Sequence, residues 1–197
     1  MAIHQRPLTE TLVRQLYELA CTPFRLASFR DRWDSFGWSY KPSVGDEFGF
    51  QVQVPGAWPL STDPLGEEVI GASLPFYYWE DYDPEFHDDP EEYRHQRQAY
   101  DDEFETAVGL ARRVLPTPVQ FWTDADEDAH RAVVWGGDHG LLILQQACFD
   151  PQFGIELDFW LAGCSRQDFH PATPLIDWLC KRSQSLHAEH DFPPLRW

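Results

Sequence analysis

The side chains best placed to do chemistry are carboxylates, and they are concentrated in one quarter of the chain. Residues 80–128 hold 16 acidic and 4 basic side chains, a net charge of −12, while the whole protein of 197 residues has −18. Grouped carboxylates can ligate cations, act in pairs as general acid and base, or attract a basic protein. Each of these roles makes a separate demand on residue spacing.

Cation binding fails the spacing test. Positions 1, 3, 5 and 12 of a calcium-loop frame are occupied by Asp81, Asp83, Glu85 and Glu92. Position 6 requires glycine for a sharp turn, but this position is Phe86. A second frame, which starts at Asp124, has Ala129 there. We predict no metal site and no cofactor, and only loose divalent binding stays open.

Catalytic motifs are also missing from the sequence. It has no G-x-S-x-G nucleophile elbow, no H-E-x-x-H zinc motif and no glycine-rich phosphate loop. His187 and His190 lie one helical turn apart but lack a clear third metal ligand. Cys164 and His170 could form a reactive pair, but a buried, unreactive thiol is the more common case. We therefore predict no catalytic residues and no enzyme; a small hydrolase with a carboxylate-lined site is the less favoured alternative.

Aromatic residues inside the acidic stretch favour a docking surface for a basic protein. Solvated charge and the dipole of a following helix account for Asp88, Asp89 and their neighbours. They do not account for the mid-helix pair Asp101 and Glu105, which repel at i, i+4. Aromatic side chains next to charges are typical of interface anchors. The predicted partner-binding residues are Glu80, Asp81, Tyr82, Asp83, Glu85, Phe86, Asp88, Asp101, Asp102 and Glu105.

The element that must position half of this surface is a long helix over residues 90–115. Asp89 as N-cap, Pro90 at the first helical position and Glu92 three residues after the cap predict its start. Its apolar residues fall on one side at helical spacing, and Pro116 predicts its end. Shorter helices are predicted over Thr9 to Cys21, over Ser28 to Phe36 with Ser28 as N-cap and Gly37 as C-cap, and over residues 173–187.

Strands are predicted on both sides of the long helix. Alternating apolar residues indicate strands at 48–54 and 153–161, and apolar runs indicate 119–123, 132–135 and 141–148. Two further strand pieces are predicted at 69–74 and 76–80, interrupted by Pro75, which suits a sheet edge or a bulge. Residues 57–66, with Pro59 and Pro64, are typical of a loop, and glycines 136, 137 and 140 predict a hairpin. Short connections favour antiparallel pairing. We predict an α+β domain with a mainly antiparallel sheet of five to six strands and helices packed on it.

The composition predicts a single globular domain over residues 1–197. Its parts are a helical N-terminal region (8–36), strands (48–80), the long helix (90–115), antiparallel strands (119–161) and a C-terminal helix (173–187). A hydrophobic content of 43% can fill a core. The four dispersed cysteines predict free thiols in a reducing, cytoplasmic compartment. The charge of −18 argues against nucleic acid and against an anionic membrane as partners.

Residues 90–161 carry a family resemblance. The segments concerned are Glu92 to Phe104, the Val-Val-Trp-Gly run at 133–136, Leu141 to Gln146 and 153–161, with Gly37-Trp38 before them. Together they resemble small acidic proteins encoded beside bacterial polymorphic toxins, the immunity proteins. The resemblance implies a cytosolic, non-enzymatic inhibitor of one cognate toxin, and it transfers no catalytic residue. A secretion chaperone or adaptor, which would form a stable dimer with an apolar groove, is the alternative binding function.

Overall fold

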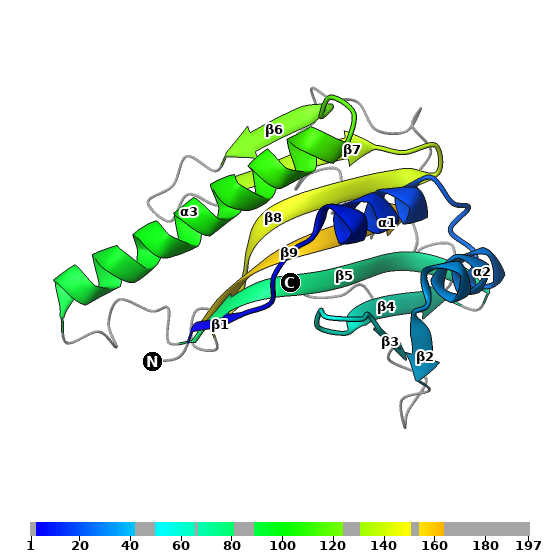
Figure 1. Cartoon of the computed structure of the whole chain (residues 1–197), viewed down its shortest axis with the longest axis horizontal. Coiled ribbons are helices and arrows are strands. Elements are labelled where there is room, and N and C mark those ends of the chain that lie inside the picture. Colours follow the sequence, from blue (N-terminus) through cyan, green and yellow to red (C-terminus); the bar gives the residue numbers. More distant parts are fainter. Residues whose placement is uncertain are drawn as a thin grey trace. The chain divides into compact units, whose positions relative to one another are not determined.

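An antiparallel β-sheet with helices on one side forms the centre of the protein (Figure 1). The computed structural model describes residues 3–41, 50–65, 67–80, 89–123, 131–150 and 154–163, which all lie within one compact unit over residues 1–166. Its helices are α1 (Glu10–Ala20), α2 (Leu26–Phe36) and α3 (Pro90–Val114). Its strands are β1 (Ile3–Gln5), β2 (Ser39–Lys41), β3 (Phe50–Gln53), β4 (Leu60–Leu65), β5 (Glu68–Trp79), β6 (Gln120–Thr123), β7 (Arg131–Gly136), β8 (Gly140–Asp150) and β9 (Gly154–Gly163). The predicted C-terminal helix at 173–187 lies outside the described residues.

The strand order is β2-β3-β4-β5-β9-β8-β7-β6, with β1 also paired to β5, and every pair is antiparallel. The predicted α+β class and antiparallel sheet are confirmed. Nine strands are described where five to six were expected. Strands β1 and β2 have only three residues each and give no alternation to detect, and β4 lies in a segment that was expected to be a loop. The predicted β7–β8 hairpin is present, with the N–H of Gly137 donating to the Gly140 carbonyl.

Two prolines lie inside strands, and in β5 the register with β9 shifts between Pro75 and Tyr77, as expected for a bulge. The predicted loop at 57–66 contains β4, whose pairing with β5 shifts register at Asp63/Pro64. Pro75 lies inside one continuous strand β5, where two separate pieces were expected. Along one edge of β5, β4 pairs up to Ser73 and β1 begins to pair at Tyr77. Pro75 therefore falls in the gap between these two neighbours, where its missing N–H is tolerated.

The helix ends follow their capping residues, with one correction. The Thr9 hydroxyl accepts a hydrogen bond from the Leu12 N–H at 3.1 Å, and the Asp89 carboxylate accepts one from the Glu91 N–H at 2.8 Å. Helix α2 begins at Leu26 rather than after Ser28, and no side chain caps it. Gly37 ends α2 in the left-handed conformation (φ 73°), as predicted.

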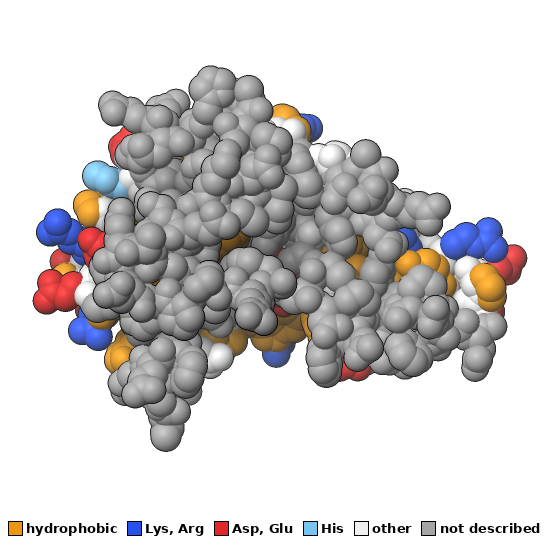
Figure 2. All heavy atoms as spheres, turned by 180° about the vertical axis from the view of Figure 1, so that it is seen from behind, with side chains coloured by type: hydrophobic (Ala, Val, Ile, Leu, Met, Phe, Trp, Pro, Cys, Tyr) orange, Lys and Arg blue, Asp and Glu red, His pale blue; other side chains and the backbone are white. Residues whose placement is uncertain are grey.

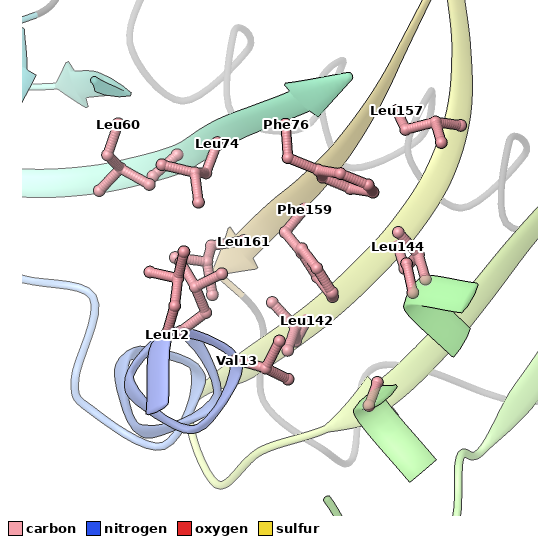
Figure 3. Packing of buried hydrophobic residues seen from close by; sticks show 14 of the residues in the cluster. Leu12, Val13, Leu60, Leu74, Phe76, Leu142, Leu144, Leu157, Phe159 and Leu161 are labelled. Atoms are coloured by element: carbon pink, nitrogen blue, oxygen red, sulfur yellow. The ribbon is translucent and has the colours of Figure 1, made fainter. Parts of the chain in front are cut away.

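The main core lies between the sheet and the helices. Figure 3 shows Leu74, Phe76, Phe159 and Leu142 on the side of the sheet where α1 lies, with Val13 of α1 beside Leu142. Each of these side chains is at most 1% exposed, and each buried side chain of this size contributes about 2 kcal/mol. Helix α3 adds Tyr100 and Phe104 to the same cluster. This packing fixes which side of α3 faces away from the sheet.

The other face of the sheet is also buried. Val134 and Ile143, which are partners in the β7–β8 register, have 0% exposure and alternate with residues of the main core. Next to Ile143, in the β9 register, comes Trp160, which is half-buried. Polar side chains on the buried part of this face are therefore shielded from water.

Candidate functional site

Four of the ten predicted partner-binding residues lie in the described part of the chain. Glu80 directly follows β5, and Asp101, Asp102 and Glu105 lie on α3. The other six lie outside the described residues: Asp81, Tyr82, Asp83, Glu85, Phe86 and Asp88. The acidic group at 124–128 also lies outside them.

Asp101 and Glu105 are joined by an arginine from the sheet. Arg131, the first residue of β7, donates from Nη2 to Asp101 Oδ1 at 3.2 Å and from Nη1 to Glu105 Oε1. Its guanidinium also lies 4.5 Å from the centroid of the Phe104 ring. Arg131 therefore offsets the repulsion expected from the i, i+4 spacing of the two carboxylates.

Further hydrogen bonds complete this arginine cluster, which we define as Arg97, Asp101, Glu105, Arg131 and Gln146. Gln146 of β8 donates from Nε2 to Asp101 Oδ1 at 2.7 Å and accepts from Arg131 Nε at 3.2 Å. Arg97 donates from Nε to Asp101 Oδ2 at 3.3 Å. The side chains of Asp101 and Arg131 are 31% and 25% exposed, so their attraction is screened less than that of a surface pair. The cluster ties α3 to β7 and β8.

The outward side of α3 carries three carboxylates, and among the described residues Arg131 compensates only one of them, Glu105. At about 100° per residue, Glu91, Asp102 and Glu105 fall within about 60° of one another, opposite Tyr100 and Phe104. Within the described residues, no arginine, lysine or histidine forms an ion pair with Glu91 or Asp102. Among the described residues, the carboxylate of Asp102 accepts a hydrogen bond only from the neutral amide of Gln98, at 2.8 Å. The side chains of Glu91, Asp102 and Glu105 are all exposed.

Acidic side chains also lie along the flank of α3 that faces β5. Glu92 accepts a hydrogen bond from Gln96 Nε2 at 3.1 Å. Burial, and next the negative charge of Glu103, raise the pKa of the Tyr77 hydroxyl on β5. Glu80, at the end of β5, has His4 Nε2 3.3 Å from its Oε1. The α3 carboxylates without an ion pair among the described residues therefore lie on its outer side and on this flank.

Elsewhere the surface of the described residues mixes both signs of charge. In the view of Figure 2, red acidic side chains lie beside blue basic ones at both ends of the molecule. Exposed pairs of this kind occur on α1, where Glu10 contacts Arg14 at 3.6 Å, and between α1 and α2, where Glu18 contacts Arg32 at 3.9 Å. Such pairs cancel charge locally and contribute little to stability.

The sequence did not single out a second pair of carboxyl groups, Glu156 and Asp158. Asp158 of β9 is 1% exposed, and Glu156 lies two residues before it on the same face. Burial, and next the charge of Glu156, raise the pKa of Asp158 well above its usual range, although hydrogen bonds from Gln145 and Ser73 oppose the shift. Burial alone raises the pKa of Glu156. Oδ1 of Asp158 has no hydrogen-bond partner.

The register explains why Asp158 is poorly satisfied. It stands between Gln145 of β8 and Pro75 of β5. Proline has no N–H or polar side chain to donate, so the donors come from Gln145 and, diagonally, Ser73. A neutral, protonated carboxyl fits this environment better than a carboxylate. The alternation of β9 predicts which face Asp158 lies on, but not that this face is buried.

The described residues contain no group of three or more side chains that could hold a metal ion. Nor is any helix among them both long and apolar enough to cross a bilayer. No protein-family model matches the chain, and neither a characterised protein nor a solved structure is significantly similar to it.

Proposed function

We propose that this protein is a non-enzymatic binding protein that neutralises a basic partner, as an immunity-type inhibitor does with its cognate toxin. The observation that carries the proposal is the exposed carboxylate side of α3, where Glu91 and Asp102 have no ion pair within the described residues. A basic partner would be attracted over a distance by the charge of −18 and oriented by this side. The predicted cytoplasmic location is part of the same proposal.

The hydrogen bonds of the arginine cluster reduce the number of α3 carboxylates that are available to a partner. Asp101 already accepts from Arg97, Arg131 and Gln146, so a partner would have to break these bonds to use it. Asp102 and Glu92 need no such rearrangement, because among the described residues their carboxylates accept from neutral glutamine amides. No described donor reaches the Glu91 carboxylate, so a partner can use it directly. We therefore assign partner recognition to Glu91, Glu92 and Asp102 ahead of Asp101 and Glu105. The residues at 81–88 remain a proposed continuation of the surface.

The test is co-expression with the product of the adjacent gene, followed by co-purification and titration of the complex. The triple variant E91Q/E92Q/D102N removes two charges from the outer side of α3 and one from the flank that faces β5. We expect it to slow association at least about tenfold at low salt, with a smaller effect at high salt. The matched control is D31N/D34N, which removes two exposed charges from α2 and leaves association within about twofold.

Three outcomes would contradict the proposal. One is the absence of any complex with the neighbouring gene product. Another is a complex whose association rate is the same for the α3 variant and the α2 control. The third is a stable dimer of the free protein, measured by its mass in solution, which would favour the chaperone or adaptor alternative.

A further inference from the structure

A hollow of about 390 Å³ lies where α3 ends beside the edge strand β6. Its described walls are Arg112, Leu115, Pro116, Thr117, Pro118 and Phe121. Because two of these residues are prolines with fixed φ, the wall is formed before anything binds. The hollow lies at the opposite end of α3 from Glu91, and the inference below does not depend on the proposed function.

Strand β6, which lies beside this hollow, is an edge strand of the sheet. It is the last strand in the sheet order and pairs, among the described strands, with β7 alone. The outer edge of such a strand offers alternating N–H and C=O groups to an added strand. Native proteins commonly protect an exposed edge with charged side chains or prolines. Here the central position of β6 is instead occupied by Phe121, which is 56% exposed.

Arg112 supplies a positive charge at the same place. Its Cζ lies 5.1 Å from the centroid of the Phe121 ring, and no acidic side chain of the described residues forms an ion pair with it. The next residue, Arg113, is different, because it donates from Nε to Glu10 at 3.2 Å. An arginine that stacks on an aromatic ring and has no anion of its own is suited to receive a carboxylate.

We infer that the outer edge of β6 binds an extended segment of a partner protein, which adds to the sheet as a strand. A residue of that segment opposite Phe121 would have its Cβ about 5 Å away. An apolar side chain there would enter the hollow against Leu115 and Pro118. A residue two positions away points to the same side, and a carboxylate there would reach Arg112. The ligand is therefore a peptide in which an apolar residue and an acidic residue are two positions apart.

The test is selection of random heptapeptides, displayed on phage, against the full-length protein. We expect enrichment of alternating sequences with an acid two residues from an apolar residue, and affinities of about 10–100 µM for the synthetic peptides. R112A and F121T each weaken binding about tenfold. R113A is the matched control, because it removes a neighbouring arginine outside the hollow, and its affinity stays within about twofold of wild type.

Strand addition has its own signature. A selected peptide with N-methyl groups on the amides that face β6 loses binding, whereas methylation of the alternate amides leaves it intact. Equal loss with both methylation patterns would exclude an added strand.

Other outcomes would overturn the inference. These are no enrichment over uncoated beads, selection of basic peptides, or peptides that bind F121T as well as wild type. Concentration-dependent dimers in sedimentation that disappear in F121T would assign the edge to a second copy of the chain and overturn the partner peptide. Circular dichroism of R112A and F121T verifies that both variants are folded; these side chains are exposed, so their removal leaves the core intact.

Discussion

Two pairs of carboxyl groups in this protein have similar spacing along the chain and opposite environments. Asp101 and Glu105, one helical turn apart, lie in the middle of the acidic stretch and have Arg131 between them. Glu156 and Asp158, two residues apart on a strand, lie outside that stretch of the sequence, and Asp158 accepts side-chain hydrogen bonds from the neutral donors Gln145 and Ser73. The pair in the most acidic region is thus neutralised, while the isolated pair has the raised pKa values. The density of acidic residues along the sequence is a poor guide to the local potential.

The substitution with the largest expected effect on stability removes Arg131. Arg131→Met keeps the length of the side chain but leaves Asp101 and Glu105 facing one another and Gln146 without its donor. We expect a loss of about 2–3 kcal/mol in the free energy of unfolding, measured with urea at neutral pH. Arg14→Met on α1 is the control, since its exposed pair with Glu10 contributes at most about 0.5 kcal/mol. Equal losses in the two variants would refute the special role of Arg131.

Removing the carboxyl group of Asp158 should instead raise the free energy of unfolding at high pH. The folded protein keeps a proton on Asp158 that the unfolded chain releases, so the free energy of unfolding falls as pH rises from the usual carboxyl pKa to the raised one. Asp158→Asn imitates the neutral form. We expect it to be more stable than wild type by about 1–2 kcal/mol at pH 8, and no more stable at pH 4.

Urea unfolding of Asp158→Asn and wild type across this pH range makes the comparison. Glu156→Gln is a milder counterpart, because it removes one cause of the Asp158 shift and keeps the acid itself. A variant Asp158→Asn that is destabilised equally at both pH values would show that the carboxyl is needed for packing rather than tolerated.

Within the arginine cluster, exposure should rank the two acids. Asp101, 31% exposed, accepts from three side chains, whereas Glu105 is 62% exposed and accepts from Arg131 alone. We expect Asp101→Asn to cost about 1 kcal/mol and Glu105→Gln about 0.3 kcal/mol. A double-mutant cycle with Arg131→Met measures each coupling energy. The reverse ranking would mean that Glu105 is the main anchor of Arg131.

The smallest effect concerns the opposite flank of α3. Glu103 is the second cause, after burial, of the raised pKa of Tyr77. Glu103→Gln should therefore lower the pKa of Tyr77 partway toward its usual value and change stability by only a few tenths of a kcal/mol. Titration of the Tyr77 ring carbons by NMR, assigned with Tyr77→Phe, measures this shift. An unchanged pKa would leave burial as the sole cause.

Local sequence patterns predicted most of the secondary structure. Helical spacing, Thr9, Asp89 and Gly37 defined three helix ends. Alternation located the long central strands β5 and β9, because one of their faces is packed on the main core. Short strands escaped detection, since three residues such as Ile3–Gln5 pair only because β5 already offers an edge. Ser28 failed as an N-cap, because tertiary packing begins α2 two residues earlier, at Leu26.

The site was less predictable, because its chemistry depends on residues distant in the sequence. Arg131 is 30 residues from Asp101, and Gln146 is 45 residues from it. No spacing rule connects these positions, and only the pairing of β7 with β8 brings them together. For the same reason, Glu156 and Asp158 resembled ordinary outward-facing acids of an amphipathic strand. Whether a second sheet face is covered is a property of the whole fold.

The pairing of β5 with β9 has a consequence for how the chain folds. On one side of this seam β2 to β5 are successive neighbours, and on the other β6 to β9 are, so both groups can form from nearby segments. The seam itself joins Gly71 to Ala162 and Trp79 to Ile155, and it closes a loop that contains all of α3. Long-range closure of this kind slows folding. Substitutions at the seam should therefore change the folding rate more than those in either hairpin group, which makes β5–β9 the kinetic bottleneck of the molecule.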